Sequence, residues 1–337
     1  MPAEWDRHEA TWIAWPYNLE TWPTQLYQVE EIYIQMIEAL SSGEKVNVLV
    51  NGSSGQEVAE KRLTGANVSL ENVFFYHIEN FDAWMRDAGP IFVTRENELT
   101  PIATINWIFN AWGNKYQPWP HDNEISSKIA LHLKMPRFEP GIVLEGGSID
   151  VNGFGTLLTT EQCLLNKNRN PSLSKIEIEQ YLKDFLGVQK IIWLKKGIEG
   201  DDTDGHIDDI ARFTKATTII CAVEEDESDP NYHPLQENYK LLRGMRDNFG
   251  RPLEIVKLPM PGPVPGPEGR APASYTNFYI GNEVVLIPIF GHPNDEVALK
   301  IVGGQFPNRR AVGVQCEALV YGMGAIHCVT QQEPAVT

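Results

Sequence analysis

A short apolar strand, a turn and a second apolar strand form a unit that recurs along this chain of 337 residues. The four clear copies occupy residues 89–104, 147–163, 208–225 and 276–291. Their starts lie roughly 60 residues apart, and such a period is the signature of a repeat architecture. Weaker copies near residues 8–16 and 318–332 could share one further unit between the two ends. The sequence predicts an α/β fold of about five ββαβ modules closed around an axis. We see no domain boundary and treat residues 1–337 as a single domain.

Helices are expected between the strand pairs. Four segments have the apolar spacing of amphipathic helices, at residues 24–43, 172–187, 231–250 and 294–307. The expected helix ends are Gly43 for the first, Ser172 or Ser174 and Gly187 for the second, and Asn294 or Asp295 and the pair Gly303-Gly304 for the last. The Pro-rich segment 258–275 is not expected to form regular structure, and we interpret it as a surface loop over one mouth of the ring.

The charge balance limits the partners of the chain. There are 28 Lys and Arg against 45 Asp and Glu, which gives a formal net charge of -17. This charge argues against nucleic acid or an anionic membrane as partner, and it is compatible both with simple solubility and with attraction of a small cation. No apolar run predicts a membrane span, and residues 1–16 lack the features of a secretory signal. We therefore expect a cytoplasmic protein.

The cysteines are widely spaced, with neither a CxxC pair nor the spacing of zinc ligands. They are Cys163, Cys221, Cys316 and Cys328. In a reducing compartment they are expected to be free thiols. Cys163 and Cys221 lie in apolar segments typical of a core. Cys328 follows a glycine-spaced turn and precedes a polar run, which is less typical of a core position.

The segment "GDDTDGHIDDIARF" at residues 200–213 places five aspartates around His206. A calcium loop, a solvated acidic turn and a pocket for a cation are the three interpretations. The calcium loop fails, because aligning Gly205 with the invariant glycine of an EF-hand puts Ala211 where a bidentate Glu is required. If a strand begins at His206, then His206 and Asp208 share one face. One side chain could then move protons while the other holds a positive charge.

Two other segments place acids beside the repeated strands. "FDAWMRDAGP" carries Trp84 and Asp87, and "VLEGGSIDV" carries Glu145 before two glycines. Each residue alone also suits an ordinary structural role, such as pairing of Asp87 with Arg86. Together with His206, Asp208 and Cys328 they form a constellation that could do chemistry.

The same segments resemble the agmatine deiminase family, which is grouped with the Porphyromonas-type peptidylarginine deiminases. The similar motifs are "MPAEWDRHEATWIAWP", "WMRDAGPIFV", "LEGGSIDVNGFGTLLTTEQCLLNKNRNP", "DDTDGHIDDIARF" and "IHCVTQQEP". They extend from the first residue to within a few residues of the last. The resemblance implies the five-bladed, pseudo-symmetric α/β propeller of the guanidine-modifying enzymes, known as the pentein fold, in agreement with the repeats.

The resemblance also implies an activity: hydrolysis of agmatine to N-carbamoylputrescine and ammonia through a covalent Cys-thiouronium intermediate, with no metal or cofactor. The implied roles are Cys328 as nucleophile, His206 as general acid/base, Glu145 as its orienting partner, Asp87 and Asp208 as guanidinium ligands, Trp84 as a stacking surface and Asn277 as a hydrogen-bonding group in the pocket. Such a mechanism is chemically reasonable, because paired carboxylates hold a planar guanidinium and a thiolate attacks its carbon.

Several alternatives stay open. The substrate could be free or peptide-bound arginine, the amidine acceptor could be an amine, as in an amidinotransferase, or the protein could be a catalytically silent binding module. A site for arginine must neutralise the extra carboxylate, and the motifs offer few candidates for this, namely Arg86 beside Asp87 and Arg212 after His206. The negative charge and the covering loop favour agmatine, a dication, over arginine and over a peptide. Closed propellers commonly dimerise, so a homodimer is a further alternative.

Overall fold

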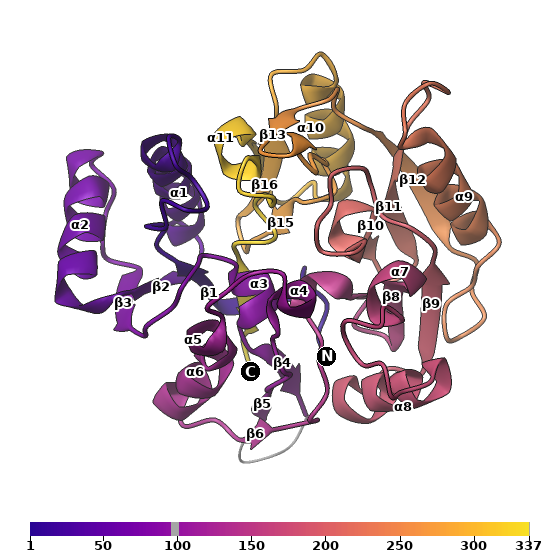
Figure 1. Cartoon of the computed structure of the whole chain (residues 1–337), viewed down its shortest axis with the longest axis horizontal. Coiled ribbons are helices and arrows are strands. Elements are labelled where there is room, and N and C mark those ends of the chain that lie inside the picture. Colours follow the sequence, from indigo (N-terminus) through magenta and orange to yellow (C-terminus); the bar gives the residue numbers. More distant parts are fainter. Residues whose placement is uncertain (96–100, 337) are drawn as a thin grey trace.

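The computed structural model describes residues 1–95 and 101–336. In these residues the strands form five sheets of three or four strands and one two-stranded pair. The five sheets are arranged around a common centre, with helices on the outside (Figure 1). The predicted α/β fold of repeated modules is confirmed.

Four of the five larger sheets are built from strands consecutive in sequence, and the fifth joins the two ends of the chain. The sheets are β18-β1-β2-β3, β4-β5-β6, β7-β8-β9, β10-β11-β12 and β15-β16-β17, with β13-β14 as the separate pair. The strands are β1 (His8–Ala14), β2 (Lys45–Val50), β3 (Val73–His77), β4 (Ile91–Thr94), β5 (Ile102–Ile105), β6 (Arg137–Phe138), β7 (Asp150–Val151), β8 (Thr156–Thr160), β9 (Lys190–Leu194), β10 (Ala211–Lys215), β11 (Thr218–Val223), β12 (Glu254–Pro259), β13 (Pro265–Gly266), β14 (Gly269–Arg270), β15 (Tyr279–Ile280), β16 (Val284–Ile289), β17 (Arg310–Gln315) and β18 (Gln331–Pro334).

The four clear strand pairs of the sequence are antiparallel hairpins, each followed by a parallel third strand. Strand β10 pairs with β11 antiparallel, and β11 then pairs with β12 parallel after an intervening helix. The middle strands β8 and β11 are buried along their whole length, because both faces of each sheet are covered. The turn predicted between β4 and β5 falls on residues 96–100, outside the described residues.

The two ends of the chain share a sheet, as the weak repeats predicted. Strand β18 pairs antiparallel with β1, with Thr11 opposite Gln332, and β1 pairs parallel with β2. This pairing brings the segment that carries Cys328 next to the N-terminal segment. The ring is closed by hydrogen bonds between residues more than 300 positions apart.

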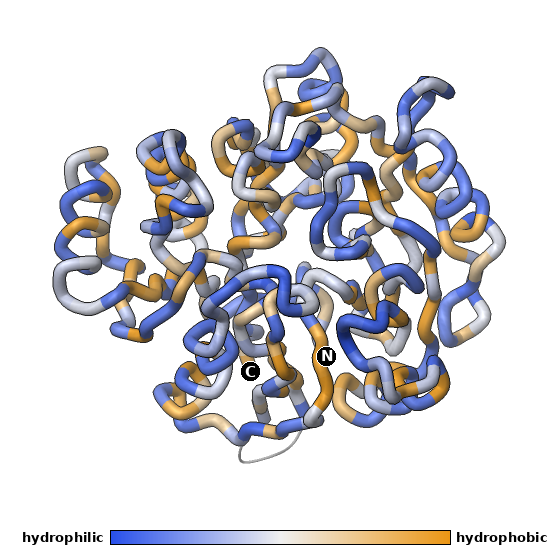
Figure 2. Tube along the Cα trace, in the orientation of Figure 1, coloured by the Kyte–Doolittle hydropathy of each residue, from blue (hydrophilic) through white to orange (hydrophobic). Residues whose placement is uncertain are grey.

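The longer helices connect strands of the sheets and lie on the outside of the ring (Figure 1). The helices are α1 (Leu26–Ser41), α2 (Gly52–Gly65), α3 (Met85–Ala88), α4 (Ala111–Asn114), α5 (Pro120–Asn123), α6 (Ile125–Leu133), α7 (Glu161–Leu164), α8 (Lys175–Leu186), α9 (Tyr232–Arg243), α10 (Asn294–Gln305) and α11 (Glu317–Val320), with short 3-10 turns η1 (Gly146–Ser148) and η2 (Ile207–Asp209). Hydrophilic and hydrophobic residues alternate along the longer helices (Figure 2), as expected when one face of a helix packs against a sheet. Among the described residues, none of the helices is both long and apolar enough to cross a membrane.

The predicted helix ends are partly correct. Helix α8 starts with a capping box between Ser174 and Glu177 and ends at Gly187 in the left-handed conformation. Helix α1 ends without such a cap, so the expectation for Gly43 was wrong. Helix α10 continues through Gly303, where an added Cβ would lie 2.9 Å from the Cβ of Ala311. That glycine permits close packing of the helix on β17 rather than ending the helix.

Two further expectations need correction. Residues 207–209 form the turn η2, and the strand begins only at Ala211, so His206 and Asp208 are not on one strand face. The Pro-rich segment contains the end of β12 and the short pair β13-β14. A two-residue pair tolerates Pro265 because it requires few backbone donors.

Candidate active site

Three loops converge at Gly147 in the turn η1. A Cβ on this glycine would lie 2.6 Å from His206 Nδ1, 2.9 Å from Asp87 Oδ1 and 3.0 Å from Asp208 Oδ2. The backbone N–H of Gly147 donates to Asp87 Oδ1 at 2.9 Å, and Trp112 Nε1 donates to Asp87 Oδ2 at 2.9 Å. His206 Nδ1 lies 3.8 Å from Asp87 Oδ2. The structure therefore brings two carboxylates and one imidazole around a position that only glycine fits.

Glu145 immediately precedes this turn and is fully buried. Arg169 donates to Glu145 Oε1 at 2.5 Å, while Glu145 Oε2 has no hydrogen-bond partner among the described residues. Ligand atoms of Glu145, Cys163 and His206 lie within 4.8 Å of one another. The guanidinium of Arg169 would oppose a divalent cation there. The absence of a metal stays a prediction.

Cys328 lies in a turn of residues 326–329, and its thiol is buried beside Asn277 and Asp208. Asn277 Nδ2 lies 3.2 Å from Cys328 Sγ, and Asp208 Oδ2 lies 4.0 Å from it. Asn277 also donates to Asp209 Oδ1 at 2.9 Å. The thiol thus shares a side-chain network with two aspartates.

Burial dominates the protonation of these groups. Burial and Glu145 raise the pKa of Asp87 to about 7. Burial and then Asp87 raise the pKa of Asp208 well above its usual range. Burial and the surrounding carboxylates, Asp208 first, raise the pKa of the Cys328 thiol. Burial and Arg169 lower the pKa of His206. Without a ligand, the thiol is protonated and His206 is neutral.

A cavity of about 320 Å³ opens onto this cluster. Trp84, Asp87 and Cys328 line it, whereas His206, Asp208, Glu145 and Asn277 lie next to it without lining it. Its walls include several aromatic rings, with Trp84 and Trp112 centroids 6.5 Å apart. Its acidic lining residues are Glu20, Asp82, Asp87, Asp122, Asp202 and Glu268. Within the described chain, no Lys, Arg or His lines this cavity.

Three other carboxylates that line the cavity also have raised pKa values. Burial raises the pKa of Asp122 to about 7 and that of Asp82 to about 6. Burial also raises the pKa of Asp202 to about 6, although Tyr116 donates a hydrogen bond to it. A cation entering the cavity would favour the ionised form of each of these acids.

The arginines near the motifs face a different environment. Arg86 donates to the backbone oxygen of His327 at 3.3 Å and to Gln332 at 2.7 Å, and so it does not pair with Asp87 in the way the simplest interpretation suggested. Arg212 forms ion pairs with Glu4 at 2.7 Å and with Asp150 at 2.5 Å. Both guanidinium groups are engaged in a buried network and do not line the cavity.

Sequence reasoning gave no role to three residues that contact the predicted site. Trp112 and Arg169 bind the two acids Asp87 and Glu145, and His327 binds Asp208. Arg169 and His327 lie in the quoted motifs, so their positions were visible. Trp112 carried no local signal, because it reaches Asp87 from an irregular segment with positive φ at residues 111–114.

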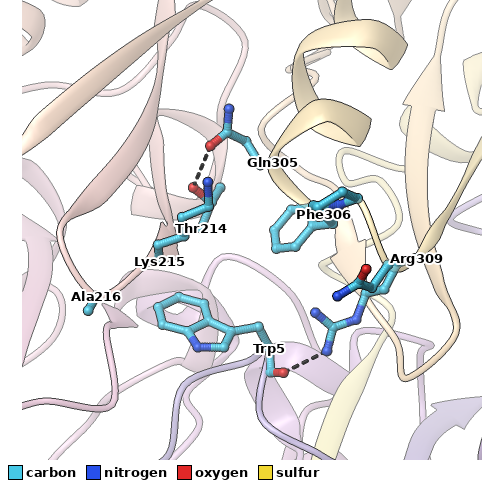
Figure 3. Close-up of a pocket in the computed structure, with 9 residues that line it drawn as sticks. Trp5, Thr214, Lys215, Ala216, Gln305, Phe306 and Arg309 are labelled. Carbon is cyan, nitrogen blue, oxygen red and sulfur yellow. Dashed lines mark hydrogen bonds between the residues drawn. The ribbon is translucent and has the colours of Figure 1, made fainter.

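A second cavity, of about 250 Å³, lies elsewhere, between β10 and the loop after α10 (Figure 3). It is lined by Trp5, Phe306, Lys215 and Arg309 among others and contains none of the predicted site residues. Arg309 donates to the backbone oxygens of Trp5 and Gly281. Among the described residues that line this cavity, none is a cysteine, a histidine or a carboxylate.

The cavity is acidic, and a buried thiol, two carboxylates and an imidazole lie beside it. These are the features of a site that binds a cationic group and attacks its carbon with a nucleophile. Comparison with known proteins agrees. The model of the Porphyromonas-type peptidyl-arginine deiminase family matches residues 1–334. The chain belongs to this family.

Individual relatives are similar over their whole length. An agmatine deiminase of Medicago truncatula is 38% identical over 367 residues, covering 100% of this chain and 96% of the relative. An agmatine deiminase of Ectopseudomonas mendocina is 38% identical over 358 residues, covering 99% and 95%. The solved structure of an agmatine deiminase of Enterococcus faecalis has a TM-score of 0.92 and 38% identity, covering 99% of this chain and 95% of that one.

Proposed function

We propose that this protein hydrolyses the guanidinium group of agmatine, giving N-carbamoylputrescine and ammonia. Full-length similarity to agmatine deiminases supports the reaction. The observation that carries the choice of substrate is the lining of the cavity: six carboxylates and, among the described residues, no basic side chain. Agmatine is a dication, so both of its ends suit such a cavity.

In the proposed reaction, Asp87 and Asp208 accept N–H bonds from the guanidinium and hold it in plane. The Cys328 thiol gives its proton to His206, and the thiolate forms a bond to the central carbon. His206 returns the proton to one nitrogen, which leaves as ammonia, and a Cys-thiouronium remains. A water that loses its proton to His206 then adds to the carbon. As the C=O bond forms, the C–S bond breaks and the Cys328 thiolate takes up the hydroxyl proton, while His206 gives its proton to the released ammonia. Overall, the guanidinium cation and water become a neutral ureido group and ammonium.

The substrate supplies the positive charge that the free site lacks. The carboxylates around Cys328 disfavour the thiolate, and His206 is neutral. A guanidinium bound next to the thiol opposes these carboxylates and lowers the pKa of the thiol. The nucleophile is therefore formed when the cation is present. Glu145, which reaches within 4.8 Å of His206, acts as a positioning residue for the imidazole.

Arginine is expected to be a poor substrate because its carboxylate would enter an acidic cavity. Arg86 and Arg212, the two candidates to neutralise it, are engaged by Gln332, Glu4 and Asp150. Pro267 and Glu268, from the turn between β13 and β14, also line the cavity and narrow the access of a peptide. We expect kcat/KM for agmatine at least about a hundredfold above that for arginine, which corresponds to about 2.7 kcal/mol of differential transition-state binding.

The test measures ureido product and ammonia with agmatine, arginine and a peptidyl-arginine side by side, with Cys328→Ala as the inactive control. Comparable kcat/KM for agmatine and arginine, or efficient conversion of the peptide, would remove the agmatine assignment and leave the deiminase chemistry. Transfer of the amidine to an added amine in place of water would identify an amidinotransferase. The single catalytic domain, the cytoplasmic location, the lack of nucleic-acid binding and the homodimer stay predictions.

A further inference from the structure

His327 is a buried imidazole that lies between two carboxylates and has no part in the mechanism above. Its Nδ1 lies 2.7 Å from Asp208 Oδ2, and its Nε2 lies 2.9 Å from Glu4 Oε2. Each of these contacts needs one proton, because a carboxylate without a proton can only accept. A neutral imidazole carries one N–H. A second proton must therefore be shared within the trio, on Asp208, on Glu4 or on the ring.

The charges around the trio indicate where that proton lies in the free site. Glu4 accepts from Arg212 at 2.7 Å and from the backbone N–H of Ile280 at 2.9 Å, which favours its ionised form. Although burial opposes it, Arg212 and His327 hold the pKa of Glu4 well below its usual range. Asp208 has one oxygen, Oδ1, without a hydrogen-bond partner among the described residues. The second proton therefore belongs on Asp208, which donates it to Nδ1, while Nε2–H donates to Glu4.

The other titratable or charged groups that act on this trio come from several elements. Arg86 and Arg212 act on His327. Asp208 is surrounded by Asp87, Asp201, Asp209 and the Cys328 thiol. Asp150 lies near Arg212, and Tyr279 lies near Arg86. The arginines disfavour a charged His327 in the free site, and the neighbouring acids disfavour a charged Asp208. A neutral ring and a neutral Asp208 satisfy both groups of charges.

Binding of a guanidinium changes this balance, and here the argument rests on the proposed function. The cation requires a carboxylate at Asp208 to accept its N–H bonds, so Asp208 must lose its proton. We infer that this proton moves along the 2.7 Å contact to His327 Nδ1 and stays in the protein, with Glu4 holding the resulting imidazolium at Nε2. The O–H bond of Asp208 breaks, and an N–H bond forms on the ring. His327 and Glu4 are thus positioning residues that let Asp208 ionise when the cation binds.

The direct test is 15N NMR of Cys328→Ala protein labelled at histidine, titrated with agmatine at pH 8. This variant binds without turnover. The His327 ring resonances are assigned by their loss in Cys328→Ala/His327→Gln. We expect one protonated and one unprotonated ring nitrogen in the free protein and two protonated nitrogens in the complex. A ring that is neutral in both states, or already imidazolium in the free protein, would overturn the inference.

His8 is the internal control, because it is buried, its Nδ1 lies 3.2 Å from Glu44 and its Nε2 contacts the backbone oxygen of Glu4 at 2.7 Å. The ring 15N resonances of His8 should keep their positions when agmatine is added. Calorimetry in buffers of different ionisation enthalpy gives a second readout. Compared with Cys328→Ala, the double variant Cys328→Ala/His327→Gln should release about one more proton per site when agmatine binds at pH 8, since the ring can no longer take the proton. Equal release by the two proteins would contradict the inference. Turnover of agmatine by the wild-type protein tests the proposed function separately.

Discussion

The affinity of the site for a guanidinium should depend on pH through Asp87. Burial and Glu145 raise the pKa of this carboxyl from 3.8 to about 7, so it is mostly protonated at pH 6 and mostly ionised at pH 8. The guanidinium keeps its charge over this range. Because the cation binds the ionised carboxylate, the affinity must rise as the pH rises through the pKa of Asp87.

The magnitude follows from the same pKa. Ionising Asp87 costs about 1.4 kcal/mol at pH 6 and about 0.1 kcal/mol at pH 8, so Asp87 alone should contribute an increase of about tenfold in the association constant between them. Titration calorimetry of Cys328→Ala with agmatine measures this association constant at each pH, without turnover and without ionisation of the thiol. Asp87→Asn in the same background should bind more weakly at pH 8 and should lack this tenfold increase.

Asp208 and Asp209 also have raised pKa values, so the comparison between the two proteins isolates the contribution of Asp87. A matched control is Asp226→Asn, which changes an exposed acid whose side chain accepts from Ser228. This control should follow the parent protein at each pH. Parallel pH curves for the parent and Asp87→Asn would show that Asp87 does not titrate on binding and would refute the reasoning.

Three shorter predictions concern the nucleophile, the glycine at the centre of the site and the absence of a metal. Cys328→Ser should abolish ammonia release while circular dichroism stays unchanged, and a variant with substantial kcat would exclude Cys328 as nucleophile. Gly147→Ala should lower kcat/KM by at least about tenfold, because its Cβ would displace His206 and Asp87, whereas Gly65→Ala, with open space around it, should be silent in the same assay. Dialysis against a chelator should leave activity unchanged, and recovery of lost activity with one specific divalent ion would contradict this.

The fold was predictable where its determinants are local. Each hairpin and its following helix are adjacent in sequence, so the alternation of strand and helix is visible as a period. The turn η2 shows the limit of such patterns. Ile207 and Ile210 are both fully buried, and the N–H of Ile210 donates to the oxygen of Ile207 at 2.9 Å. Apolar residues three apart fit a 3-10 turn as well as an irregular strand start, so the sequence alone could not exclude either.

The predicted site residues lie together because their loops meet at Gly147 and Gly324. The motifs located these residues, but not the contacts that hold them. Glu4 reaches His327 across 323 residues of sequence, and Trp112 reaches Asp87 from a different sheet connection. The contact between Glu4 and His327 depends on ring closure by β1 and β18. No local pattern in the sequence encodes either contact.

The protonation of the site depends on burial, which the sequence does not specify residue by residue. From residue types alone, a histidine, a cysteine and several aspartates suggest a charged ion-pair site. Once all of them are buried, His206 loses its charge, the Cys328 thiol keeps its proton, and Asp87 titrates near pH 7. Within the part of the chain that the structure describes, no unpaired cationic side chain lies next to the nucleophile, because Arg86 and Arg212 are bound by Gln332 and Asp150. The cationic substrate therefore supplies the positive charge that the free site lacks. Burial and Arg169 lower the pKa of His206, whereas burial and the neighbouring carboxylates raise the pKa of the Cys328 thiol, so neither group carries a charge before the cation binds.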